Sequence, residues 1–300
     1  MRKEKNFYKV SSLCELFGVS RQSYYLHHEI DFERLVFKGF ILEYVHDVRL
    51  KAPRIGCQKL FEMCKSYFGE KLTMGRDAFY NLLRESGLML RVKRRKARTT
   101  YSDPYAPFYP NLIKGLIPTA ANQVWVSDIT YVWTSKGFCY LFLITDLYSH
   151  RIMGWVLSSS MKCKNAEEAL NQAVETAGYP LTGLIHHSDR GIQYTCFAYM
   201  ELLAKNGMQA SRTEHGDPLE NAVAERVNGI LKQEWLSLYS FENEDEIRKV
   251  LIPAIEFYNK ERPHASNNWL TPEQAYKQDK ELKRMWKNYP YTKTHISVYQ

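Results

Sequence analysis

The sequence predicts an α/β domain with a mixed sheet, preceded by an all-helical, basic region. Apolar residues recur at helical spacing through residues 10–90, and glycines stand where helices would end. From about residue 120 the pattern changes to runs of β-branched and aromatic residues, which are typical of strands. The excess of positive charge also lies in the first of these two regions. Residues 1–100 hold 21 Lys and Arg against 11 Asp and Glu, whereas residues 101–300 hold 20 against 22.

Composition limits the class of protein. A chain of 300 residues is long enough for two domains, and its six cysteines form no C-x-x-C pair. There is no apolar run of ~18 residues, which a membrane-spanning helix needs, and no apolar segment follows the basic N-terminus. We therefore expect a cytoplasmic protein without a membrane segment. Its basic first third indicates a polyanionic partner.

Residues 10–28 predict a helix-turn-helix. Gly18 would end the first helix and Ser20 would cap the second. On that second helix Arg21 and Gln22 are the residues expected to contact DNA, since such a helix enters the major groove. Two short helices around a glycine turn also occur as plain structure.

Residues 31–90 predict a second helical unit, and two interpretations of it remain open. It is either another helix-turn-helix-like unit or a small bundle packed against the following domain. Its helices are expected near residues 31–49, 56–67 and 76–86.

A linker is expected at residues 101–119, which hold four prolines. The densest basic run, which includes Arg94 and Arg95, lies just before it. These two arginines are either part of a solvated hinge or phosphate contacts.

The domain from residue 120 to about 260 alternates strands and helices. Strands 123–133, 140–150 and 151–159 are expected to form an antiparallel meander. After them come a helix, a strand, a helix, a strand and a helix, over residues 165–178, 184–189, 195–206, 207–213 and 219–238. This order is that of the ribonuclease-H-like fold. Residues 261–300 are expected to form a C-terminal tail.

Three carboxylates stand out in this domain. Asp128 lies inside an apolar strand, where an unpaired charge is costly unless it binds a metal. Asp189 lies where another strand ends, the usual place for functional groups in α/β sheets. Glu225 lies on the last helix, on one face with Asn221 and Lys232. Sixty residues separate Asp128 from Asp189, and 35 separate Asp189 from Glu225.

These motifs resemble those of the IS-three family of bacterial insertion-sequence transposases, in the retroviral-integrase-like DDE superfamily. The resemblance is carried by WVSDITYV, HHSDRGIQYT, GDPLENAVAERVNGILKQEW and YNKERPHASNNWLTPEQAY, and by RIGCQKL and GRDAFYNLLRESGL in the helical region. It implies an integrase catalytic core of ribonuclease-H-like fold behind a helical DNA-binding region.

The resemblance makes Asp128, Asp189 and Glu225 the catalytic metal ligands and Lys232 a DNA contact. Three hard carboxylate donors suit two Mg²⁺ or Mn²⁺ ions, which can neutralise the attacking and leaving oxygens of a phosphodiester. Asn221 and Arg226 are further expected DNA contacts. His187 shares a strand face with Asp189, because side chains alternate along a strand. We expect it to contact and orient the metal ligands without binding the metal itself.

The predicted function is metal-dependent cleavage and strand transfer at the ends of an insertion sequence. The expected partners are double-stranded DNA, both the element's terminal inverted repeats and the target, and at least one further copy of the chain. Two alternatives remain: a nuclease of the same fold without strand transfer, and a catalytically silent regulator active only when fused to an upstream reading frame.

Overall fold

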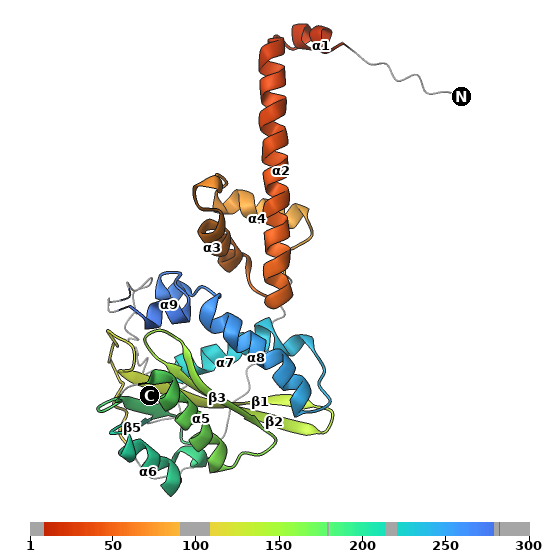
Figure 1. Cartoon of the computed structure of the whole chain (residues 1–300). Coiled ribbons are helices and arrows are strands. Elements are labelled where there is room, and N and C mark those ends of the chain that lie inside the picture. The colour runs from red at the N-terminus through yellow and green to blue at the C-terminus, as the bar shows by residue number, and fades with distance from the viewer. Residues whose placement is uncertain (1–8, 91–108, 179, 214–220, 279–281, 283–300) are drawn as a thin grey trace, which may run out of the picture.

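The computed structural model describes residues 9–90, 109–178, 180–213, 221–278 and 282. Figure 1 shows a globular body built around a sheet, from which one long helix projects with a short helix at its far end. Within the described residues no helix is both long and apolar enough to cross a membrane.

The body contains a five-stranded mixed sheet in the order β3-β2-β1-β4-β5. Its strands are β1 Val124–Thr134, β2 Gly137–Asp146, β3 Ile152–Ser158, β4 Ile185–Ser188 and β5 Gln209–Arg212. The first three pair antiparallel as the predicted meander, and β4 and β5 continue the sheet parallel to β1. This topology confirms the predicted ribonuclease-H-like fold.

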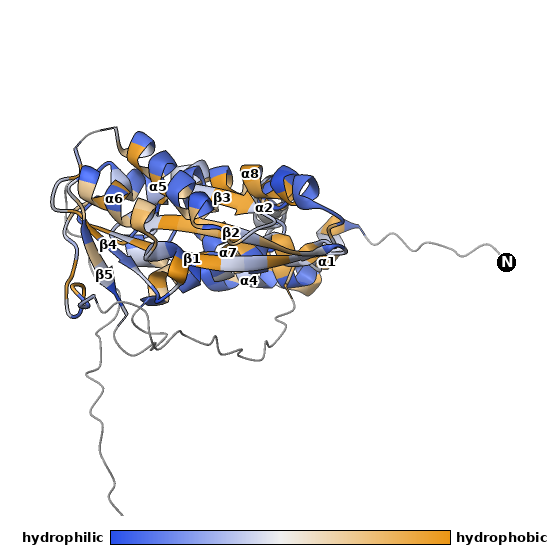
Figure 2. Cartoon of the chain, turned by 90° about the horizontal axis from the view of Figure 1, so that it is seen from below, coloured by the Kyte–Doolittle hydropathy of each residue, from blue (hydrophilic) through white to orange (hydrophobic). Residues whose placement is uncertain are grey.

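Helices cover both faces of the sheet. The side chain of Trp125 packs with α5 (Cys163–Ala177) and α6 (Phe197–Lys205) on one face. On the other face, Val124 and Val126 meet α7 (Ala222–Glu234), and α8 (Glu244–Lys260) lies beyond. Because β1 is covered on both sides, its buried half is apolar at consecutive positions. Figure 2 shows these apolar strands between helices whose outer faces are polar.

The N-terminal region differs from the prediction in one respect. The turn between α1 (Val10–Leu16) and α2 (Arg21–Lys51) is present, with Gly18 at φ 65° and the Ser20 hydroxyl accepting from Ser23 N–H at 3.0 Å. However, the separate helices expected at 21–28 and 31–49 are one continuous helix of 31 residues. The predicted interruption between these two helices was wrong, because residues 28–31 contain neither Gly nor Pro to end the first helix.

The lower half of α2 packs with α3 (Cys57–Phe68) and α4 (Arg76–Glu85). A short 3₁₀ turn, Gly69–Lys71, follows α3. This three-helix unit is attached to the body at the end of α2. The indole Nε1–H of Trp235 donates to Lys51 O at 2.8 Å, and Lys51 Nζ lies 3.0 Å from Glu261 Oε2.

Residues 261–278, which the sequence analysis placed in a tail, are packed on the body. The buried guanidinium of Arg262 makes a two-pronged contact with Glu234 at the end of α7, at 2.8 and 2.7 Å. Its third nitrogen lies 2.8 Å from His264 Nε2. The short helix α9 (Pro272–Tyr276) closes this segment. The domain therefore extends past residue 260 as far as 278.

The close packing of α5 on β3 depends on Gly154. A Cβ at this position would lie 2.1 Å from Ala169 O and 2.7 Å from Ala173 N, both backbone atoms of α5. Since backbone cannot swing away as a side chain can, only glycine allows this approach.

We expect Gly154→Ala to destabilise the protein by about 1–3 kcal/mol or more, because the helix must move off the sheet. Urea unfolding measures this. Gly229→Ala, within α7, is the control: its Cβ would meet only Gln233 Nε2 at 3.9 Å. It should stabilise the helix by about 0.5–1 kcal/mol. Equal effects of the two changes would contradict the packing argument.

Candidate active site

Asp128 and Asp189 are brought together by the register of two parallel strands. β1 pairs with β4 so that Val126 lies opposite His187 and Ser127 opposite Ser188. Asp128 and Asp189 are the next residues along each strand. Neighbouring strands lie about 4.8 Å apart, so these carboxylates extend from adjacent positions on one face of the sheet.

Burial and like charge act together on Asp128. Desolvation is the largest cause, and with the neighbouring charges of Asp189 and Glu225 it raises the pKa of Asp128 to about 7. The amide Nδ2–H of Asn228 donates to Asp128 Oδ2 at 2.7 Å and opposes this shift. The carboxylate is thus oriented by a residue of α7. A nearby cation would offset the burial and the like charges that disfavour its ionised form.

Asp189 begins the loop between β4 and α6. The loop passes through a 3₁₀ turn, Ile192–Tyr194, and Gly191 N–H donates to Asp189 Oδ1 at 2.9 Å. Burial raises the pKa of Asp189, while this hydrogen bond and the charge of Arg212 on β5 lower it. A Cβ on Gly191 would lie 3.0 Å from Asp189 Oδ1, so the small residue also leaves room for the carboxylate.

Helix α7 lies along β1, with one polar face toward the strand. Asn221, the residue before the helix, donates from Nδ2 to Ser127 O at 2.9 Å. Asn228 follows seven residues later and reaches Asp128, and the ammonium of Lys232 lies 4.4 Å from the centre of the Tyr131 ring. The predicted shared face of Asn221 and Lys232 is therefore the face that contacts β1.

Glu225 lies in the first turn of α7, and its side chain is exposed. Burial is the larger cause that raises the pKa of Glu225, and the charge of Asp189 is the smaller one. The Glu225 carboxyl group therefore interacts electrostatically with Asp189. Among the described residues, however, no three His, Cys, Asp or Glu side chains form a cluster ready to hold a metal.

The donor chemistry of this site nonetheless fits a hard cation. The charge of Asp189 raises the pKa values of both Asp128 and Glu225, and burial raises the pKa of Asp189 itself. The buried Oδ1 of Asn228 also has no hydrogen-bond partner. Carboxylate and amide oxygens are ligands that Mg²⁺ accepts.

The two histidines before Asp189 face opposite ways, as expected. His186 Nε2 lies 2.7 Å from Ser127 Oγ and 2.9 Å from Tyr199 Oη, and burial lowers the pKa of His186 to about 3. His187 is on the face of Asp189, and its Nδ1 lies 2.9 Å from Ser211 Oγ on β5. It therefore fixes β4 to β5 beneath the carboxylate.

The other predicted site residues are spread widely. Arg226 is exposed on α7 beside Glu225, whereas Asn221 is only 6% exposed because it is engaged with β1. Arg21 and Gln22 are exposed at the start of α2, at the end of the helix remote from the sheet (Figure 1). Arg94 and Arg95 lie outside the described residues.

Asn228 was not identified from the sequence as the partner of Asp128. It follows Glu225 by three residues, a spacing that places the two on one face of a helix and was a usable signal. Gly191 could not be found in this way, since its role depends on the path of the loop after Asp189.

Two family models, both described as integrase core domain, match the chain at residues 118–218 and 206–272. The chain is 36% identical over 267 residues to the insertion element IS600 uncharacterized 31 kDa protein of Shigella sonnei, covering 87% of this chain and 96% of the relative. It is 34% identical to the transposase for insertion sequence element IS629 of Shigella sonnei, covering 64% of each chain. It is 31% identical to transposase InsF for insertion sequence IS3A of Escherichia coli K12, covering 64% and 67%.

Among solved structures, the chain is similar to the HTLV-2 integrase catalytic core domain in complex with magnesium. The TM-score is 0.43 at 19% identity, and the match covers 52% of this chain and 97% of that domain.

Stability should depend on pH through Asp128. The folded carboxyl has a pKa of about 7, whereas the unfolded value is about 3.9, so between these values the folded state binds the extra proton. The contribution of Asp128 to the stability of the metal-free protein should therefore grow as the pH falls from about 8 to about 5, while buried His186, whose pKa is lowered, contributes in the opposite direction.

Urea unfolding in chelator measures this dependence, and Asp128→Asn is the comparison because it removes this group alone. Burial also raises the pKa of Asp146, and its contribution is present in both proteins and cancels in their difference. The same pH dependence in the wild type and in Asp128→Asn would contradict the assignment.

Proposed function

The chain belongs to the insertion-sequence transposases of the retroviral-integrase-like superfamily, and from this premise we propose that it cleaves and joins DNA strands at the ends of such an element. The observation that carries the proposal is the side-by-side placement of Asp128 and Asp189 beneath the helix that bears Glu225. The DNA would be the element's terminal repeats and a target duplex, held by at least two copies of the chain.

Asp128, Asp189 and Glu225 would hold divalent cations, with Mg²⁺ or Mn²⁺ as the ions that suit these donors. When bound, two such ions supply charge neutralisation at the attacking and leaving oxygens of a phosphodiester. The exposed side chain of Glu225 would complete the ligand set by a change of rotamer, since the described geometry does not gather all three carboxylates.

The remaining residues would orient these ligands and the DNA. Asn228 fixes the Asp128 carboxylate by its 2.7 Å hydrogen bond, and Gly191 N–H does the same for Asp189. Lys232 lies on the same helix as Glu225 and reaches the β1 surface at Tyr131, where its charge would meet a phosphate. Arg226, beside Glu225, is exposed for the same role. Asn221, Arg21 and Gln22 remain proposed DNA contacts.

The silent-regulator alternative is not favoured, because relatives that match about two thirds of this chain are named transposases. It differs from the proposal in one measurable property. A regulator needs to bind DNA, whereas a transposase also needs intact carboxylates.

Asp189→Asn and Glu225→Gln should each abolish metal-dependent nicking and strand joining on DNA that carries the element's ends, while DNA binding is kept. The loss should exceed the roughly 100-fold that removing an outer partner of a metal ligand costs. Mapping of nicked and joined strands with Mg²⁺ or Mn²⁺ provides the measurement.

Glu175→Gln is the matched control, since Glu175 is an exposed carboxylate on α5. It should keep full activity. Nicking that persists in Asp189→Asn would overturn the catalytic assignment. Cleavage products without joined strands, in the wild type, would favour a nuclease of this fold.

Lys232→Ala should weaken binding to all DNA sequences about equally and should reduce the slope of log K against log salt by about 0.9 for the lost phosphate contact. Titrations at several salt concentrations test this. Lys205→Ala, at the end of α6, is the control and should leave the slope unchanged. An unchanged slope for Lys232→Ala would overturn the proposed phosphate contact.

A further inference from the structure

Helix α2 has two apolar faces. One consists of Phe37, Ile41, Val45 and Val48 and packs into the core with α3 and α4. The other consists of Tyr25, Phe32, Leu35, Val36 and Phe40, which are 56%, 62%, 65%, 42% and 53% exposed. At 3.6 residues per turn, Phe32 points opposite to Ile41. We call this exposed set the arm stripe.

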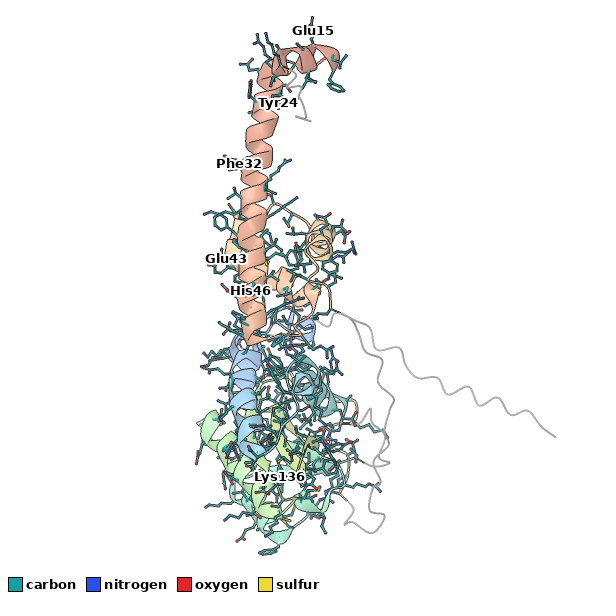
Figure 3. All side chains as sticks on the ribbon, turned by 90° about the vertical axis from the view of Figure 1, so that its right-hand side faces the viewer. Glu15, Tyr24, Phe32, Glu43, His46 and Lys136 are labelled. Atoms are coloured by element: carbon teal, nitrogen blue, oxygen red, sulfur yellow. The ribbon has the colours of Figure 1, made fainter. Side chains whose placement is uncertain are left out.

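Folding of the described chain does not explain the arm stripe. It lies on the part of α2 that projects from the body, where Phe32 is labelled in Figure 3. Five large apolar side chains at neighbouring turns are more than the scattered single residues expected on a surface, and such patches mark interfaces. Phe32, Val36 and Phe40 follow one another at intervals of four residues, and Tyr25 lies seven residues before Phe32, so these side chains lie along one side of the helix.

We propose that the arm stripe is the interface with a second copy of this chain, packed antiparallel along α2. The direction follows from charge. Exposed Arg21 lies at one end of the stripe side of the helix, and exposed Glu43 and Asp47 lie at the other. An antiparallel pair brings Arg21 of each copy to the acidic end of its partner, whereas a parallel pair sets the two Glu43 carboxylates against each other.

The area is sufficient for such a pair. A fully exposed aromatic side chain offers about 150–250 Å². With the exposed fractions above, the stripe offers on the order of 500 Å² per copy, or roughly 1,000 Å² for the pair, which is near the lower limit for a specific interface. DNA is a poor occupant of the arm stripe itself, because none of its five side chains carries a charge to meet phosphate.

The test uses the full chain without DNA or metal, so its outcome is separate from that of the proposed catalysis. Sedimentation equilibrium over a concentration series should show a dimer for the wild type. Val36→Asp should raise the dissociation constant about 100-fold or more, because each copy would bury an uncompensated carboxylate.

Ile252→Asp is the matched control. Ile252 is also an aliphatic, β-branched residue in mid-helix, is 52% exposed, and lies on α8 of the body. It should leave the dimer intact, and circular dichroism should show the same helix content in both variants. Equal loss in the two variants, or a wild type that stays monomeric at high micromolar concentration, would overturn the proposal.

A charge exchange tests the direction. Arg21→Glu and Glu43→Arg should each weaken the dimer, and the double variant should recover most of the lost affinity. Failure of the double variant to recover would exclude the antiparallel pair. Hydrogen exchange that protects the stripe only after DNA is added would assign it to DNA instead.

Discussion

The parallel pairing of β1 with β4 is the constraint on which the site depends. With Ser127 opposite Ser188, the next residues of the two strands are both aspartates, and the chain must hold two like charges side by side. A slip of one residue would turn one carboxylate to the opposite face. The fold compensates only partly, through the amide of Asn228, the backbone N–H of Gly191 and the more distant charge of Arg212. The pKa of Asp128 stays raised because burial and the neighbouring negative charges outweigh these stabilising contacts.

Helix α7 joins this site to the rest of the molecule. Its first end is fixed to β1 through Asn221 and Ser127 O, so Glu225 is carried above the two aspartates. Its last end is fixed by Glu234, which is held by the buried guanidinium of Arg262 and also lies 3.9 Å from Lys59 on α3. The N-terminal helical unit and the segment after α8 thus meet at one carboxylate. Removing either partner of a buried pair is costly, and here it would also free the helix that carries Glu225.

The strands and the positions of Asp128 and Asp189 were predictable because each leaves a local signal, such as a charge within the apolar run around Asp128 or polar residues at the end of β4. The role of Glu225 rests on the resemblance and stays a prediction. The order of strands and helices then fixed the topology. Helix α8 and the packing of Arg262 were not predicted. An arginine is expected at the surface unless its buried partner, here Glu234 on another helix, is known. The continuity of α2 was not predicted, although no Gly or Pro lies between the two expected helices to end the first one.

Charge distribution separates the tasks of the two regions. Residues 101–300 have a net charge of −2, and Asp128 and Asp189 lie side by side at the site, so an approaching phosphate backbone is repelled there. The first hundred residues carry a net charge of +10 and attract the same backbone. On the proposed function, we expect affinity for DNA to reside mainly in the helical region and the site to accept a phosphate only once its carboxylates are neutralised. Binding of cations and binding of DNA at the site would then favour each other, because each reduces the electrostatic cost of the other.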